Sequence, residues 1–223
     1  MTTAATDSPQ PQRKGRTKMP PRLRQPRRSE IASEEIQRVF DGLFGDRDPV
    51  VEPGTKAGTP GNWWTTMAIE PGIFHLIEER HAWQYSTERR LAPVLRELAI
   101  TRAGWARGSQ FVYSQHVKTL RRLGVDEAKI ASLPSWSSAD CFTSQERALL
   151  GYVDDLVLGS GRVPDERFTQ LRSVLSDVEI LELTYMTCTY DMSSTMALAL
   201  RLEYDDRPDP IVEVTSIAGP QSE

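Results

Sequence analysis

The chain has 223 residues, 39% of them hydrophobic, and a formal net charge of -4. This is enough for one domain with a sizeable core. Residues 8–29 carry eight Lys and Arg residues and no acid, so the rest of the chain is more acidic than the total suggests. An acidic domain argues against nucleic acid as its main partner, because phosphate binding requires a basic folded surface. A contact between the basic segment and an anionic partner stays open.

The cysteines and the apolar runs indicate the compartment. Cys141 and Cys188 are too far apart for a Cys-x-x-Cys motif, and two cysteines make no disulfide framework. No apolar run approaches the roughly 18 residues that a membrane-spanning helix needs. The N-terminal residues lack the apolar segment of a secretory signal. We therefore expect a cytoplasmic protein without membrane contact.

The first third of the chain divides into a tail, a helix and a loop. Residues 1–29 contain five prolines among basic residues and few large apolar side chains, so we expect a disordered tail. A helix is predicted between Ser33, whose hydroxyl can cap it, and Gly45. Residues 46–61 hold three prolines and three glycines and predict a long loop. This loop is either a lid over a pocket or a surface excursion.

Helical patterns dominate the remainder. Trp63 and Trp64 are adjacent and cannot both face one core, so one of them is expected to line a pocket or a subunit contact. Further helices are expected from Pro71, over 90–107, 109–124, 125–133 and 143–159, from Pro164, and over 177–204. Residues 211–214 show the one short strand-like alternation. The patterns predict an all-α bundle of about eight helices over residues 30–206, followed by a C-terminal tail over 207–223.

The candidate chemistry lies in residues 96–116, RELAITRAGWARGSQFVYSQH. His116 shares a helical face with Val112 and Leu120, so we expect it to point inward, where a lone histidine is more often a core residue than a catalyst. Glu97 lies on the inward stripe of the preceding helix, and a turn near residues 106–108 would bring it level with His116. Such a pair is either a proton-transfer couple or a structural ion pair.

Other polar residues nearby have structural interpretations as well. Ser109 could act as a nucleophile, but its position favours a helix cap. Tyr113 either donates a proton or packs. His75 and His81 lie roughly 240° apart around a helix and cannot share a metal ion, so no metal site is predicted.

The run Arg96-Glu97-Leu98-Ala99-Ile100, followed by Trp105 and a polar segment ending in His116, resembles the carboxymuconolactone decarboxylase and alkylhydroperoxidase-D-like (AhpD-like) superfamily. Residues 62–74 and 142–156 are similar to other segments of that family, so the resemblance covers roughly residues 30–204. It implies an AhpD-like helical bundle that assembles as a trimer or hexamer. Glu97 and His116 stand at the positions of the family's acid and histidine.

The resemblance also limits the reaction. Ser109 and Val112 occupy the two positions where the peroxidase branch carries cysteines, so hydroperoxide reduction by that thiol mechanism is not expected. Without that mechanism, the resemblance implies a cofactor-independent lyase or isomerase acting on a small carboxylated or carbonyl compound. His116 would be the general acid/base, with Glu97 as its partner and Tyr113 assisting.

The substrate contacts and the alternatives complete the hypothesis. Trp63, Trp83 and Phe111 are candidates for the apolar wall of a substrate site, and Ser109 for a polar contact. One alternative is a non-catalytic, oligomeric binding or scaffold protein of the same family. Another is thiol redox chemistry through Cys141 or Cys188, which the missing motif cysteines disfavour.

Overall fold

The computed structural model describes residues 20–56 and 58–203, and within these residues the regular structure is entirely helical. The α-helices are α1 (Glu34–Phe44), α2 (Asn62–Met67), α3 (Pro71–Gln84), α4 (Pro93–Ala106), α5 (Gln110–Arg122), α6 (Glu127–Ser132), α7 (Ser144–Val157), α8 (Asp165–Arg172) and α9 (Asp177–Leu200). Short 3-10 helices cover Arg28–Glu30 and Leu133–Ser138. The predicted all-α fold is confirmed, and the strand-like residues 211–214 lie outside the described residues.

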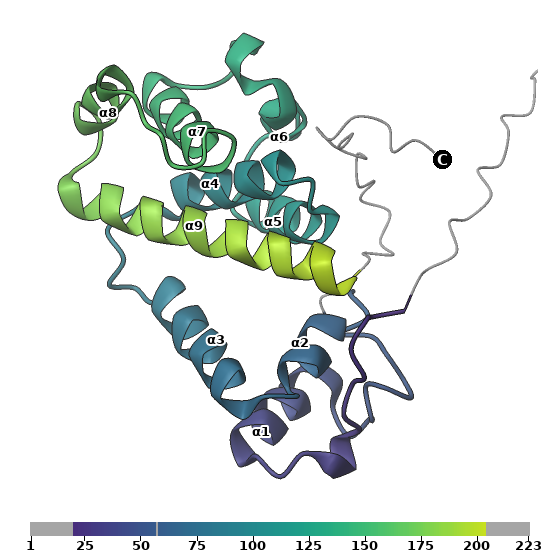
Figure 1. Ribbon diagram of the computed structural model, residues 1–223. Helices are drawn as coiled ribbons and strands as arrows, with labels where there is room; N and C mark the ends of the chain where they lie inside the picture. The colour runs from purple at the N-terminus through teal and green to yellow at the C-terminus, as the bar shows by residue number, and fades with distance from the viewer. Residues whose placement is uncertain (1–19, 57, 204–223) are drawn as a thin grey trace, which may run out of the picture.

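The helices form two groups on either side of α9 (Figure 1). The larger group contains α4 to α8 and encloses a core that includes Leu98, Leu149 and Leu183. The smaller group contains α1 to α3 and packs its core, which includes Phe40 and Phe74, against the C-terminal part of α9. The long helix α9 therefore contributes to both cores. Within the described residues, no helix is both long and apolar enough to cross a bilayer.

Several helices begin at the Ser and Thr residues whose hydroxyl groups the sequence predicts as caps. Ser33 accepts a hydrogen bond from the Ile36 N–H, and Thr143 and Glu146 form a complete capping box at α7. The helix expected over 90–107 begins later, at Pro93, because a proline is favoured at the first helical position. Leu133–Ser138, which follows α6, is a 3-10 helix that the sequence patterns do not predict.

The α4–α5 hairpin depends on close backbone contact at Gly104. A Cβ atom added to Gly104 would lie 2.7 Å from Val112 Cγ1 and 2.9 Å from the Tyr113 backbone nitrogen. Between the helices, Gly108 adopts a φ of 71°, which favours glycine. The two helices consequently pack antiparallel at short range, as the position of the predicted turn requires.

Residues 20–29 pack against the domain, whereas the sequence predicts a disordered tail through residue 29. The Arg22 N–H donates to the Leu200 carbonyl at 3.0 Å. The Arg28 guanidinium donates to the Asp41 carboxylate and to the Gly45 carbonyl at the C-terminal end of α1. A cation is favourable there because the carbonyl end of a helix carries partial negative charge. Composition alone could not reveal these partners, since they lie on α1 and α9.

Candidate functional site

A cavity of about 260 Å³ lies where α2 and α3 of the smaller group face α5 and α9. Its lining includes Trp63, Arg80, Phe111, His116, Tyr190 and Ser193. Thr55 and Thr59 line it as well, so the long loop between α1 and α2 forms part of the cavity wall. The cavity thus combines a mostly apolar surface with several polar groups, which is typical of small-molecule sites.

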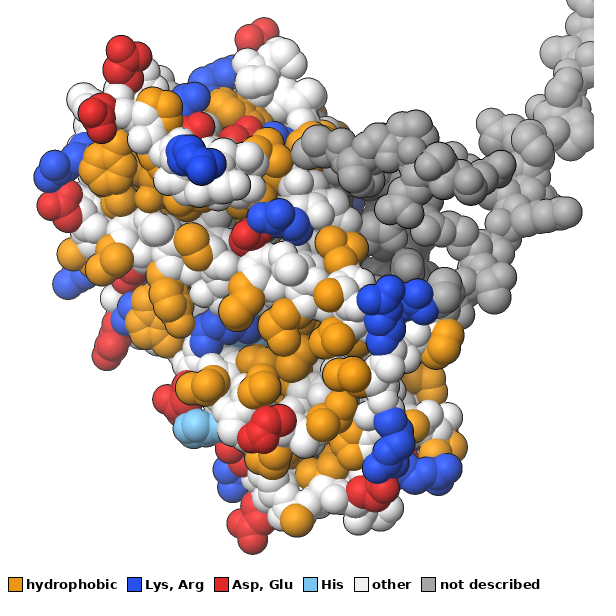
Figure 2. Space-filling view, viewed as in Figure 1, with side chains coloured by type: hydrophobic (Ala, Val, Ile, Leu, Met, Phe, Trp, Pro, Cys, Tyr) orange, Lys and Arg blue, Asp and Glu red, His pale blue; other side chains and the backbone are white. Residues whose placement is uncertain are grey.

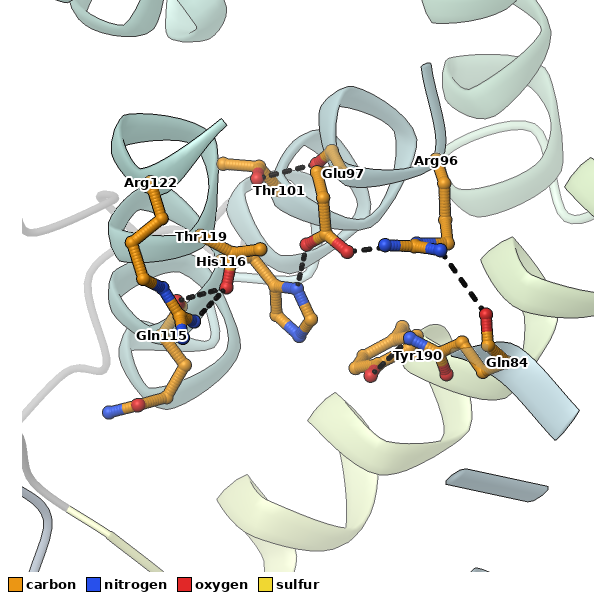
Figure 3. Close-up of polar contacts among 9 residues, drawn as sticks. All are labelled: Gln84, Arg96, Glu97, Thr101, Gln115, His116, Thr119, Arg122 and Tyr190. Carbon is orange, nitrogen blue, oxygen red and sulfur yellow. Dashed lines mark hydrogen bonds and ion pairs between the residues drawn. The ribbon is translucent and has the colours of Figure 1, made fainter. Parts of the chain in front are cut away.

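His116 and Glu97 form a buried hydrogen-bonded pair at this cavity (Figure 3). The His116 Nδ1 atom lies 2.6 Å from Glu97 Oε2, and the Glu97 side chain is fully buried. An ionised carboxylate can only accept a hydrogen bond, so Nδ1 carries the proton. In the neutral ring, Nε2 then holds the lone pair. Figure 3 shows Nε2 pointing away from Glu97, and no described residue hydrogen-bonds to it.

Arg96 holds the other oxygen of the same carboxylate. Its Nε donates to Glu97 Oε1 at 2.9 Å, and one of its terminal nitrogens donates to the Gln84 carbonyl at 3.2 Å. Burial by itself raises the pKa of Glu97, but the charges and hydrogen bonds of His116 and Arg96 outweigh it. The net pKa lies below the ordinary value for glutamate, so Glu97 stays ionised near neutral pH.

Tyr190 positions the histidine ring from α9. Its ring contacts that of His116 edge-to-face, with centroids 4.6 Å apart. Its hydroxyl accepts a hydrogen bond of 2.9 Å from Gln84 Nε2, and burial raises the pKa of Tyr190, so the hydroxyl stays protonated. His116 is thereby fixed on two sides, by Glu97 at Nδ1 and by Tyr190 against its ring.

The structure brings some of the predicted substrate contacts to the cavity. Trp63 and Phe111 both line it, with ring centroids 6.0 Å apart, and Trp64 lines it too. Trp83 lies elsewhere: its ring packs against Tyr185, and the Arg89 guanidinium stacks over it at 4.3 Å.

Two further predicted site residues have structural positions outside the cavity lining. Ser109 is the N-cap of α5, where its hydroxyl accepts a hydrogen bond from the Val112 N–H at 3.4 Å. Tyr113 is buried in the larger core, and this burial raises the pKa of its hydroxyl. We therefore assign Ser109 to capping and Tyr113 to packing, since neither reaches the cavity.

The sequence patterns miss several polar residues at the site, namely Arg80, Gln84, Arg96, Tyr190 and Ser193. Consecutive residues of a helix point in different directions. Because Glu97 is expected to point inward, the sequence predicts that Arg96 lies on the surface. Eleven of the fourteen residues of α4 are buried, which turns Arg96 inward as well. The unusually polar middle of α9 is a usable signal, but it equally fits close helix packing.

The two cysteines are both exposed and unpaired, and neither lines the cavity. Partial burial and the nearby Asp191 raise the pKa of the Cys188 thiol, which disfavours the reactive thiolate. Among the residues described, no cluster of three or more His, Cys, Asp or Glu side chains has a metal-binding arrangement.

Comparison with known proteins identifies the family. Residues 72–155 match the sequence model of the Carboxymuconolactone decarboxylase family. A crystal structure of a protein of unknown function from Agrobacterium tumefaciens, suggested to be the antioxidant defence protein AhpD, is 28% identical. The match covers 61% of this chain and 92% of that protein, with a TM-score of 0.57. Residues 72–155 therefore belong to the carboxymuconolactone decarboxylase and AhpD-like superfamily.

Two other proteins are similar to this chain. The uncharacterized protein YdfG of Bacillus subtilis is 24% identical over 118 residues, which are 52% of this chain and 80% of that protein. The debrominase Bmp8, crystallised as a C82A variant with 2,3,4-tribromopyrrole, shares the fold with a TM-score of 0.65 over 83% of this chain and 92% of its own. Its 15% identity shows a common fold alone.

The matched family segment contains part of the site. Glu97 and His116 lie within residues 72–155, as do Arg80 and Arg96. Trp63, Tyr190 and Ser193 lie outside it, on α2 and α9. The pair is thus carried by the segment with the family signature, and much of the cavity wall is not.

Proposed function

We propose that this protein is a cofactor-independent lyase or isomerase that uses His116 to transfer a proton at carbon in a small carboxylated or carbonyl compound. The observation that carries this proposal is the buried Glu97–His116 hydrogen bond of 2.6 Å beside a cavity that His116 lines. Membership in a family named for a decarboxylase supports it.

The proposed step begins with the lone pair on Nε2 of His116. This atom removes a proton from a carbon next to a carbonyl group, and the electron pair of the broken C–H bond moves into the carbonyl to form an enolate. The ring becomes an imidazolium, which the ionised Glu97 stabilises through Nδ1–H. Return of the proton to a different carbon completes an isomerisation and restores neutral His116.

A lyase reaction uses the same groups in the opposite protonation state. The bond between carbon and a departing carboxylate breaks, CO₂ leaves, and the electron pair stays on the substrate as an enolate. The imidazolium Nε2–H then protonates that carbon, and the ring recovers a proton from solvent. In both reactions Glu97 orients the ring and balances its charge, which makes it a positioning residue.

The test is a turnover assay on the wild type and on His116→Gln. One probe is carboxymuconolactone, followed by CO₂ release. The others are small oxo acids and unsaturated lactones, followed in D₂O by deuterium incorporation at carbon with proton NMR. We expect the substitution to lower the rate by about 10² to 10⁴-fold, the usual contribution of a general acid or base.

His75→Gln is the matched control, because His75 is exposed on α3 and pairs with Glu35 away from the cavity. It should retain wild-type turnover. Full activity in His116→Gln would refute the assignment. If the wild type turned over none of these probes, the result would favour the non-catalytic binding or scaffold alternative.

A further inference from the structure

Arg80 is a cation on the cavity wall that makes no hydrogen bond to any described residue. Its Nη1 atom is buried and without a partner, and its guanidinium carbon lies 5.5 Å from the centre of the Tyr190 ring. The other arginines near the site are engaged: Arg96 with Glu97, and Arg122 with the Thr119 hydroxyl at 2.7 Å. Leaving a buried charged nitrogen unsatisfied is costly, so a ligand group is expected to meet it.

Ser193 provides a second, independent observation on the same cavity. The residue is 4% exposed, and its Oγ has no hydrogen-bond partner among the described residues. Hydroxyls inside helices commonly bond to the carbonyl four residues earlier. On α9, Thr184, Thr189 and Thr195 do so, whereas Ser193 does not. Its hydroxyl is therefore available to a molecule in the cavity that it lines.

We infer that Arg80 and Ser193 bind a carboxylate group of the substrate. A guanidinium N–H and a hydroxyl supply two donors for the two oxygens of one carboxylate. The hydrogen bond between the guanidinium and the carboxylate is strong because both groups are charged. The inference rests on the proposed function for its view of His116 as the reacting group. It narrows the substrate from a carbonyl or carboxylated compound to one that carries a carboxylate.

The ring of Tyr190 links this subsite to the reacting nitrogen. Its centroid lies 4.6 Å from that of the His116 ring and 5.5 Å from the guanidinium carbon of Arg80. Because all three residues line one cavity, a small molecule can place its carboxylate at Arg80 and present another of its carbons to Nε2 of His116. Ion pairing stabilises this carboxylate, so it serves as the anchor that the product retains and not as the group lost as CO₂.

The charges around the subsite favour a monoanionic group. Glu203 also lines the cavity, but its carboxylate accepts hydrogen bonds from the backbone N–H groups of Gly61 and Trp63. Arg80 is then the one cation without a hydrogen-bonded partner among the described residues that line the cavity. One guanidinium and one hydroxyl match the single charge and two oxygens of a carboxylate, whereas a phosphate group carries close to two charges and three acceptor oxygens.

The experiment is a titration of the full chain with benzoate, benzamide and inorganic phosphate. Binding is followed by tryptophan fluorescence and by calorimetry. The variants are Arg80→Gln, Arg80→Lys and Ser193→Ala. Two matched controls are Arg38→Gln, which removes an exposed charge on α1, and Ser194→Ala, which removes a buried, unpartnered hydroxyl outside the cavity lining. Far-ultraviolet circular dichroism checks that each variant is folded.

We expect benzoate to bind the wild type more tightly than benzamide, which has nearly the same shape without the charge. Arg80→Gln should weaken benzoate binding by about tenfold or more, and Ser193→Ala by roughly threefold, as loss of a charged and of a neutral hydrogen bond predicts. Arg80→Lys should fall between the wild type and Arg80→Gln. Benzamide binding should not respond to Arg80→Gln, and neither control should change the affinity for benzoate.

Equal benzoate affinity in the wild type and Arg80→Gln would overturn the inference, as would equal binding of benzoate and benzamide or no benzoate binding at all. Tighter binding of phosphate than of benzoate would overturn the inference and show that the subsite takes a phosphate group instead of a carboxylate. His116→Gln separates the two proposals. This variant should bind benzoate normally while losing turnover. Full activity in His116→Gln would refute the proton-transfer role alone. Benzoate binding that does not change in Arg80→Gln would refute the subsite alone.

Discussion

At the scale of single residues, Glu97 shows how a carboxylate can be fully buried and still charged. Each of its oxygens accepts one hydrogen bond from a cationic or polar side chain, His116 on one and Arg96 on the other. The Arg96 guanidinium is in turn held by the Gln84 carbonyl and stacks 4.8 Å over the Tyr85 ring. This chain of contacts orients the imidazole before any substrate binds, which is what a positioned acid or base requires.

The pKa of Glu97 leads to a prediction about stability and pH. The folded-state pKa lies below the unfolded value of about 4.3, so ionised Glu97 stabilises the fold fully above that value. The contribution declines as pH falls from there through the folded-state pKa. Glu97→Gln should therefore lower the free energy of unfolding by roughly 3 kcal/mol near neutral pH, as breaking a buried ion pair does, and the deficit should narrow in acid.

Urea unfolding at several pH values between about 7 and 3 measures this deficit. Glu88→Gln is the control, because Glu88 is 85% exposed on its side chain and its ion pair with Arg89 is long, at 3.9 Å. It should track the wild type at every pH. A Glu97→Gln deficit that stayed constant with pH would show that the side chain contributes by packing and not by its charge.

At the scale of helices, the α4–α5 hairpin determines the distance between Glu97 and His116. The hairpin is local in sequence, and its turn, its cap at Ser109 and its inward faces all leave signals in the sequence. This is why the pair could be predicted before the fold was known. The burial of most of α4 could not be predicted in this way, because it results from α7 and α9 packing on α4 in addition to α5.

Gly104→Ala tests the hairpin. A methyl group there would meet Val112 Cγ1 at 2.7 Å and the Tyr113 backbone nitrogen at 2.9 Å, and backbone cannot rotate away as a side chain can. We expect the helices to be pushed apart, with a loss of about 1–3 kcal/mol in the free energy of unfolding and a loss of turnover as the pair separates. Thermal and urea unfolding, with the turnover assay, measure both effects.

Gly42→Ala is the matched control for this substitution. Gly42 lies within α1, and a Cβ atom there would have no neighbour within 4 Å. Alanine should stabilise that helix by about 0.5–1 kcal/mol, since glycine is the poorer helix former. If Gly104→Ala behaved like Gly42→Ala, close approach of the helices would not be what the glycine provides.

At the scale of the whole molecule, the cavity exists because α9 joins two groups of helices (Figure 1). The hydrogen bond between Gln84 and Tyr190 connects residues 106 positions apart. Such contacts leave no local signature, so the helices and the Glu97–His116 pair could be predicted from the sequence, whereas Arg80, Tyr190 and Ser193 could not be joined to them. The packing of residues 20–29 was missed for the same reason, since their partners lie on distant helices.

The outward face of α9 exposes a row of apolar side chains. Val178, Leu181, Tyr185 and Met192 are exposed by 50% or more and follow one another at intervals of three, four and seven residues. This spacing places them on one stripe of the helix. Figure 2 shows apolar side chains exposed over this face and over α3. Exposed apolar stripes of this kind commonly mark contacts between protein chains.

We expect the protein to form a homo-oligomer through this stripe, in line with the oligomer that the family resemblance led us to expect. Leu181→Glu places a charge on its most exposed leucine, 69% accessible, and should dissociate the oligomer because burying an unpaired carboxylate is costly. Sedimentation velocity on the wild type and the variant measures the change in mass. Leu23→Glu, at an exposed leucine outside α9, should leave the mass unchanged. A monomeric wild type would contradict the expectation, and an unchanged mass in Leu181→Glu would place the subunit contact elsewhere on the surface.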